Sequence, residues 1–127
     1  MSTLNATTVN ATTVSADTLK NVAGVEVYTC RAWVNFNGTG TVAIRASGNV
    51  SSITDNGTGD YTVNFTNAMP DANYSVTGIS GQENTTPNSN EAFLRMMTRA
   101  TNNCRVSPAD NVNNAVDAAG VCVSIFR

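Results

Sequence analysis

The fold class is evident in Tyr28-Thr-Cys-Arg-Ala-Trp-Val-Asn-Phe36. Its even-numbered positions are apolar, and most of its odd-numbered positions are polar. Because the side chains of a strand point alternately to opposite faces, this pattern predicts a strand with one buried face. Trp33 interrupts the polar face. Tryptophan is enriched at the centres of interfaces, so we expect Trp33 to be buried between subunits of an oligomer, with an ordinary core tryptophan as the alternative.

The same alternation recurs along the chain, separated by turn residues. Asn37-Gly-Thr-Gly40 and Asp55-Asn-Gly-Thr-Gly-Asp60 predict hairpins, and Ala68-Met-Pro-Asp-Ala72 predicts a connecting turn. Further strands are expected at residues 42–46, 49–53, 61–66, 74–79, 92–99, 104–107 and 121–126. About eight short strands, spaced roughly ten residues apart, predict an all-β knob built as an antiparallel β-sandwich or jelly roll.

The N-terminal segment repeats with a period of five. Residues 4–19 read Leu-Asn-Ala-Thr-Thr, Val-Asn-Ala-Thr-Thr, Val-Ser-Ala-Asp-Thr, Leu. Five helical steps of about 100° would scatter the apolar residues around a helix. In a strand, an odd period sends successive apolar pairs to opposite faces, so one straight chain cannot bury them all.

Several copies wound around one axis would bury both sets. We therefore expect an intertwined stalk at residues 1–21, followed by the knob at residues 22–127, in a homotrimer. A disordered or loosely docked arm is the alternative. The stalk residues predicted at the trimer interface are Leu4, Val9, Val14 and Leu19.

Composition argues against several partners. Charged residues make up 13% of the 127 residues, the net charge is −2, and the seven Lys and Arg residues are scattered. A basic stripe that could follow a phosphate backbone is therefore missing, and we expect no nucleic-acid binding. The first twenty residues lack a basic start and an apolar core, and no apolar run approaches the roughly 18 residues of a membrane span. We expect a soluble protein made in the cytoplasm, with no membrane insertion.

Residues that could carry catalysis are sparse. The chain has no His, which removes the commonest general base. Asp55 and Asp60 flank a Gly-rich segment that is better explained as a hairpin turn than as a calcium loop. Asp110 and Asp117 lie in an Asn-rich loop, with nothing in the sequence to fix their separation. We therefore predict no enzyme, no catalytic residue, no metal and no cofactor.

The three cysteines, Cys30, Cys104 and Cys122, have no CxxC spacing. We expect reduced thiols that act as small apolar residues. A bridge between Cys104 and Cys122 is the alternative, since both fall in predicted strands that could pair.

Three predicted loops are rich in amides: Gln82 to Asn90, Thr101 to Asn103 and Asp110 to Ala118. Asn and Gln side chains suit the hydroxyl groups of carbohydrates. The residues that could contact a receptor are Gln82, Asn84, Asn102 and Asn113. Ordinary solvated loops are the alternative.

Three segments carry a resemblance to a known family: Cys30 to Gly40, Ile44 to Phe65 and Met69 to Tyr74. They resemble the terminal domain of tail-fibre and related appendage proteins in tailed phages, notably those of cyanobacteria and marine bacteria. The resemblance covers roughly residues 28 to 80 closely. It implies a trimeric β-sandwich at the tip of a fibre, followed by variable loops that touch the host surface. The repeat likewise looks like the Thr/Asn/Ala-rich shaft found before such tips.

The expected function is therefore that of a structural protein on the virion surface, assembled in the host cytoplasm. The partners implied are further copies of the chain, other virion proteins of the tail, baseplate or capsid, and a glycan or protein on the host surface. Fully extended, residues 2–19 reach only roughly 60 Å. A capsid decoration, cement or head-fibre protein anchored by its N-terminal arm is therefore a second reading, and a carbohydrate-binding module is a third.

Overall fold

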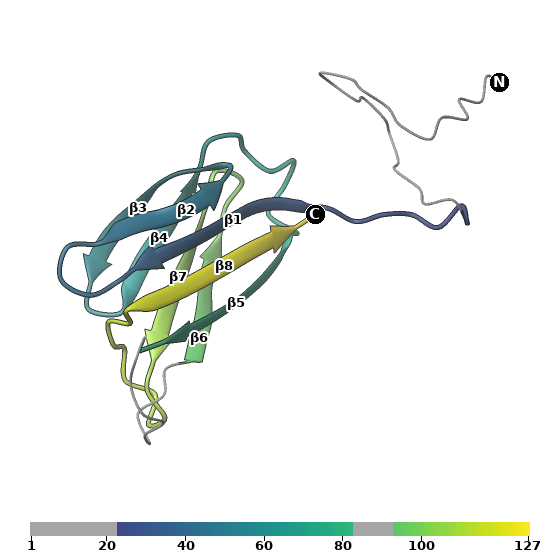
Figure 1. Cartoon of the computed structure of the whole chain (residues 1–127). Helices are drawn as coiled ribbons and strands as arrows, with labels where there is room; N and C mark the ends of the chain where they lie inside the picture. The colour runs from purple at the N-terminus through teal and green to yellow at the C-terminus, as the bar shows by residue number, and fades with distance from the viewer. Residues whose placement is uncertain (1–22, 83–92) are drawn as a thin grey trace.

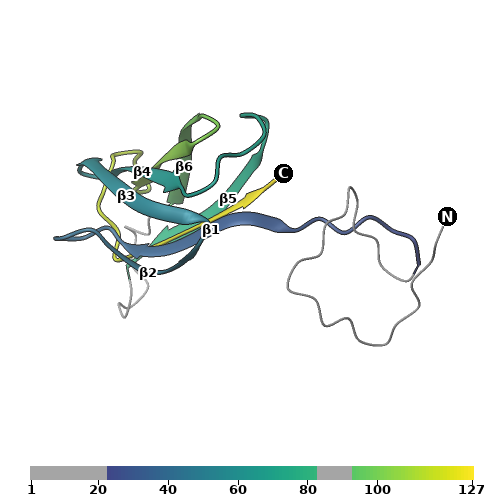
Figure 2. The same cartoon turned by 90° about the horizontal axis from the view of Figure 1, so that it is seen from above.

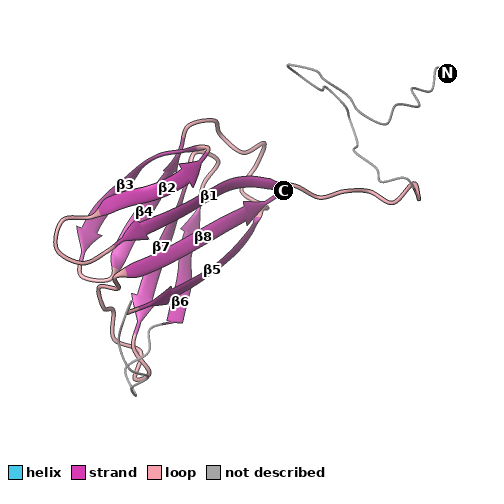
Figure 3. Cartoon of the chain, in the orientation of Figure 1, coloured by secondary structure: helices cyan, strands magenta, loops and turns pink. Residues whose placement is uncertain are grey.

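The computed structural model describes residues 23–82 and 93–127. The stalk positions Leu4, Val9, Val14 and Leu19 and the loop residue Asn84 lie outside these ranges. Within the described residues all regular structure is β-strand, with no helix (Figure 3). The eight strands are β1 (Cys30–Asn37), β2 (Ala43–Gly48), β3 (Val50–Gly57), β4 (Asp60–Phe65), β5 (Ser75–Gly81), β6 (Phe93–Arg99), β7 (Asn103–Ala109) and β8 (Gly120–Phe126).

The strands form two four-stranded sheets, in the orders β2-β1-β8-β5 and β3-β4-β7-β6 (Figure 1). Every pairing is antiparallel. The all-β prediction is therefore confirmed, and each predicted strand has a counterpart in the structure. Three connections are hairpins within one sheet: β1 to β2, β3 to β4 and β6 to β7.

The core lies between the two sheets and is built from the alternation that the sequence shows. The central strands β1, β4 and β8 bury every second side chain. The fourth central strand, β7, buries Cys104 and all of residues 106–109. Phe36 of β1 meets Tyr61 of β4 edge to face, with ring centroids 5.2 Å apart. Phe65 and Tyr74 form a second such pair at 5.8 Å. Pairs of this kind are worth about 0.5–1.5 kcal/mol beyond the area they bury.

Asn49 carries the chain from the first sheet to the second. Its φ of 55° lies in the left-handed region, which Asn tolerates better than most residues. Its side-chain amide donates to the carbonyls of Arg31 and Asn67, both at 3.0 Å, and its Oδ1 accepts the N–H of Asn67 at 2.7 Å. The sequence predicts a strand that begins at Asn49, whereas β3 begins at Val50. Asn49 is instead the corner between β2 and β3.

The turn after β3 is tighter than the sequence predicted. We expected residues 55–60 to form the turn, but β3 continues to Gly57 and β4 begins at Asp60. The carboxylate of Asp55 accepts the N–H of Gly57 at 3.0 Å across an irregularity in the strand register. This local bond lets the strand continue into what looked like loop sequence.

The cysteines are all free thiols. Cys104 is buried in β7, whereas Cys122 lies on β8 of the other sheet and is partly exposed. Because β7 pairs with β4 and β6, and β8 pairs with β1 and β5, the expectation that these two strands could pair is wrong. Burial raises the pKa of the Cys104 thiol to about 12, so Cys104 behaves as a small apolar core residue.

Candidate functional site

The two ends of the knob differ in what they carry. At one end β1 begins beside the end of β8, where Cys30 pairs with Phe126. Residues 23–29 leave the sheets at this end (Figure 2). We call it the arm end. At the other end β5 finishes opposite the first residue of β8, where Gly81 pairs with Gly120. The segment 110–119 joins β7 to β8 at this second end, which we call the loop end.

The loop 110–119 is held in shape by its own side chains. Oδ1 of Asp110 accepts the backbone N–H groups of Val112 at 3.1 Å and Asn114 at 2.8 Å. These bonds, with the N–H of Asn114 contributing most, hold the pKa of Asp110 below its usual value. Asn113 takes a left-handed conformation with φ of 72°. The tip of the loop is thus preorganised, and the exposed Val112 lies on it.

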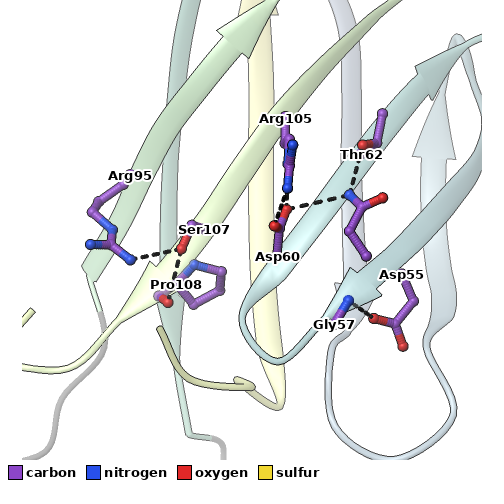
Figure 4. Close-up of polar contacts among 9 residues, drawn as sticks. Asp55, Gly57, Asp60, Thr62, Arg95, Arg105, Ser107 and Pro108 are labelled. Atoms are coloured by element: carbon purple, nitrogen blue, oxygen red, sulfur yellow. Dashed lines mark hydrogen bonds and ion pairs between the residues drawn. The ribbon is translucent and has the colours of Figure 1, made fainter. Parts of the chain in front are cut away.

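Arg95 of β6 ties this loop to the second sheet. Its guanidinium donates to the hydroxyl of Ser107 at 2.9 Å (Figure 4). It donates to Oδ1 of Asn113 at 2.8 Å. It also donates to the backbone carbonyl of Asn113 at 3.3 Å. The side-chain and backbone carbonyl oxygens of Asn113 are therefore both engaged by Arg95.

Asp117 ties the other end of the loop to the β3–β4 turn. Its Oδ1 accepts the N–H of Gly59 at 2.8 Å and lies 2.6 Å from the hydroxyl of Tyr61. Its backbone carbonyl accepts the side-chain amide of Gln82 at 3.0 Å. Gly59 must be glycine, because its φ is 60° and a Cβ there would meet the backbone of Val116. The loop end is therefore one connected unit.

The residues expected to contact a receptor do not form a single cluster. Gln82 and Asn113 both lie at the loop end. Asn102 lies in the β6–β7 turn, where its carbonyl accepts the N–H of Phe65 at 2.9 Å. The length of β7, roughly 20 Å for seven residues, separates Asn102 from the loop end. A single ligand contacting all of these residues would have to span the knob.

The acidic pairs considered for catalysis have structural partners. The carboxylate of Asp60 accepts two hydrogen bonds from Arg105, one from Nε at 2.6 Å and one from Nη2 (Figure 4). This pairing holds the pKa of Asp60 below its usual value. A general acid at neutral pH needs the opposite shift. Asp110 and Asp117, as described above, hold the loop backbone.

The outer face of the second sheet is joined by side-chain hydrogen bonds. Asn64 donates to the hydroxyls of Ser52 at 3.1 Å and Thr54 at 2.9 Å. Asn56 donates to the hydroxyl of Thr62 at 2.9 Å. Together with the Arg105–Asp60 pair, these bonds link polar side chains of β3, β4 and β7 across this face. The Asn and Thr alternation in the sequence is the signal from which this ladder could have been expected.

Trp33 lies on the outer face of the first sheet. Its side chain is 43% exposed and packs over Gly48 of β2, where a Cβ would lie 2.5 Å from the indole Nε1. The alternative of an ordinary core tryptophan is therefore wrong. Its neighbours Val34 and Ala32 point inward, so the strand register turns Trp33 outward. In the single chain it is an exposed aromatic surface.

No protein-family model, curated protein or solved structure matches the chain. Among the described residues, no three His, Cys, Asp or Glu side chains come close enough to hold a metal ion. The same part of the chain contains no helix that could cross a membrane.

Proposed function

We propose that the chain is a structural protein of a tailed-phage virion, forming a short homotrimeric fibre with a surface-exposed knob. The observation that carries the proposal is that the two ends of the knob differ. The chain enters at the arm end, and the preorganised amide-rich loop stands at the opposite end, with β8 running the full distance between them. A fibre tip needs this arrangement, because one end must be anchored while the other faces outward.

In this proposal the two sheets form a β-sandwich, and the three hairpins within single sheets favour a plain sandwich over a jelly roll. The five-residue repeat assembles the trimer because one chain cannot bury its alternating apolar pairs. The resemblance of residues 28–80 to fibre tips supports the same conclusion. An exposed Trp33 on an ordered strand is also consistent with a subunit that has neighbours.

The stalk is tested by removing it. A chain lacking residues 1–21 should fold as a monomeric knob, whereas the full chain should have the mass of a trimer by light scattering. Val9→Asp with Val14→Asp should also dissociate the trimer, because the new charges would be buried without partners. Thr8→Asp with Thr13→Asp adds the same charge at the adjacent polar positions and should leave the trimer intact. A trimeric knob without residues 1–21 would show that the stalk is not the assembler.

The location on the particle is tested by imaging virions labelled with an antibody against the knob. Label at the tail supports the tail-fibre proposal. Label distributed over the head would contradict it and indicate a capsid decoration protein.

A second candidate function is glycan binding at the loop end, favoured by the rigid amide-rich loop. A glycan array with the full chain should then give hits that Gln82→Ala weakens. Asn102→Ala, at the arm end, is the matched control. An array without hits would remove this candidate.

A further inference from the structure

The sequence Asn-Gly-Thr-Gly occurs twice in the chain, at residues 37–40 and 56–59, and these copies contain its only Asn-Gly pairs. Asparagine is a thermolabile residue. A following glycine makes it more reactive, because glycine has no Cβ to keep its backbone nitrogen away from the asparagine side chain. By sequence alone, the two pairs should react alike. Their surroundings in the folded chain differ.

The Asn37–Gly38 pair is enclosed by the fold. The N–H of Gly38 donates to the carbonyl of Ala118 at 2.9 Å, and the carbonyl of Gly38 accepts the hydroxyl of Tyr61 at 2.7 Å. A Cβ at Gly38 would lie 2.7 Å from that hydroxyl, so the space around the glycine is filled. Asn37 is itself paired with Ala43 in the β1–β2 register. The nitrogen of Gly38 therefore approaches the Asn37 side chain only when these contacts open.

The Asn56–Gly57 pair is open to solvent. Both residues are exposed, and no atom lies within 4 Å of a Cβ added at Gly57. The β3–β4 register passes from the Asp55–Tyr61 pair to the Gly57–Asp60 pair and skips Asn56. The N–H of Gly57 donates to the exposed carboxylate of Asp55 at 3.0 Å, where water can take its place (Figure 4). Little in the fold holds the Gly57 nitrogen away from the Asn56 side chain.

We infer that Asn56 is a site of spontaneous deamidation in the folded protein and that the fold protects Asn37 from the same reaction. The inference does not depend on the proposed trimer. The nitrogen of Gly57 attacks Cγ of Asn56, the Cγ–Nδ2 bond breaks, and ammonia leaves with the proton lost from the Gly57 N–H. Water then opens the resulting succinimide at either of its C–N bonds, which leaves aspartate or isoaspartate at position 56. No oxidant or reductant takes part.

Two side-chain hydrogen bonds slow this reaction. Nδ2 of Asn56 donates to the hydroxyl of Thr62 at 2.9 Å and to Oδ1 of Asp60 at 3.3 Å. Both bonds are exposed, so they open more often than the buried bonds around Gly38. The shorter bond, to Thr62, therefore limits how often the Asn56 side chain is available to the Gly57 nitrogen.

The product changes the β3–β4 turn. An aspartate at position 56 has no N–H to donate, and its charge lies beside the carboxylate of Asp60, which is the partner of Arg105. Like charges repel at this separation. Isoaspartate also adds a methylene group to the backbone of the turn, where the N–H of Gly59 donates to Asp117. Deamidation should therefore loosen the contact between this turn and the loop 110–119.

The test ages the full chain in mildly alkaline buffer and follows both sites by peptide mapping with mass spectrometry, which separates aspartate from isoaspartate. Because Gly38 reacts only through opening of buried contacts, we expect Asn56 to react at least about tenfold faster than Asn37. In urea, where both copies are unfolded, the two rates should be similar.

Three outcomes would overturn the inference. Equal rates in the folded chain, or a faster reaction at Asn37, would show that the fold does not protect that site. An Asn56 that stays intact in the folded chain but reacts in urea would show that the turn prevents the reaction. The same ratio of rates in urea as in the folded chain would assign the difference to neighbouring residues in the sequence.

Two threonine variants test the bond to Asn56. Thr62→Val removes the hydroxyl that holds the amide, and should speed deamidation there roughly fivefold. Thr54→Val is the matched control, because the Thr54 hydroxyl accepts from Asn64 instead, and its rate should match the wild type. An unchanged rate at Asn37 in the same samples shows that both variants keep the fold. A Thr62→Val chain that reacts no faster than Thr54→Val would overturn the role given to the Thr62 bond.

Discussion

The hydroxyl of Tyr61 lies 2.6 Å from Oδ1 of Asp117, although 56 residues separate the two in the sequence. The same hydroxyl lies 2.7 Å from the carbonyl of Gly38. Burial, followed by the bond to Asp117, raises the pKa of Tyr61 above its usual value. One phenol in the core thus links the β1–β2 hairpin to the loop 110–119.

Removing this hydroxyl should loosen the loop end. Tyr61→Phe removes the single hydroxyl proton that the Asp117 carboxylate and the Gly38 carbonyl share, and we expect it to lower the free energy of unfolding by about 1–2 kcal/mol. Asp117→Ala should cost more, about 2–3 kcal/mol, because the N–H of Gly59 also loses its acceptor. Asp117→Asn keeps an acceptor oxygen and serves as the conservative control. Urea unfolding measures all three, and equal stability of the Ala and Asn variants would contradict this account.

A side chain at position 48 should displace the single tryptophan. Gly48→Ala would place a methyl group 2.5 Å from the Nε1 of Trp33, and the exposed indole can move away at modest cost. We expect the fluorescence emission of Trp33 to shift to the red, with a stability loss of about 1 kcal/mol. Gly81→Ala is the control, because no atom lies within 4 Å of its added Cβ. Identical spectra for the two variants would show that Gly48 does not seat the indole.

Replacing Asn49 should lower the stability of the knob. Asn49→Gly keeps the left-handed backbone accessible but loses the bonds to Arg31 and Asn67, and should cost about 1–2 kcal/mol. Asn49→Ala loses the same bonds and adds the strain of a left-handed Ala, about 1 kcal/mol more. The expected order of thermal midpoints is therefore wild type, Gly, Ala. An Ala variant more stable than the Gly variant would mean that the corner does not depend on the φ of residue 49.

Stability should fall in acid. Arg105 holds the pKa of Asp60 below its ordinary value of 3.8, and Arg127 does the same for Asp71. Since both folded values are depressed, their stabilisation is present above pH 3.8 and is lost as the pH falls through the folded values. Urea midpoints should stay level from pH 7 to about pH 5 and decline below about pH 4.

One variant and one control test whether the Asp60–Arg105 pair causes this loss of stability in acid. Arg105→Gln should make it shallower, because Asp60 then titrates near its ordinary value. Arg31→Gln is the control, because the Arg31 guanidinium donates to the backbone carbonyl of Arg127. An unchanged acid slope in Arg105→Gln would mean that the Asp60 pair does not contribute.

The candidate site was only partly predictable. Gln82 and Asn113 could be placed in exposed loops because amide-rich segments between strand patterns are recognisable. The residues that hold the loop end, Arg95, Tyr61 and Asp117, were missed as a group, because they come from distant parts of the chain. The aspartate at position 110, before an Asn-rich run, was a local signal for the turn it forms.

By itself the sequence determined the eight strands and most of their inward faces, because alternation with a period of two depends on neighbouring residues alone. It also determined that the repeat of residues 4–19 cannot be buried by one straight chain. Only the tertiary structure decided that β8 lies between β1 and β5, that Cys104 and Cys122 belong to opposite sheets, and that Trp33 faces outward over Gly48. The physical reason is that alternation marks which face of a strand is apolar, whereas the choice of partner strand depends on packing between residues far apart in the chain.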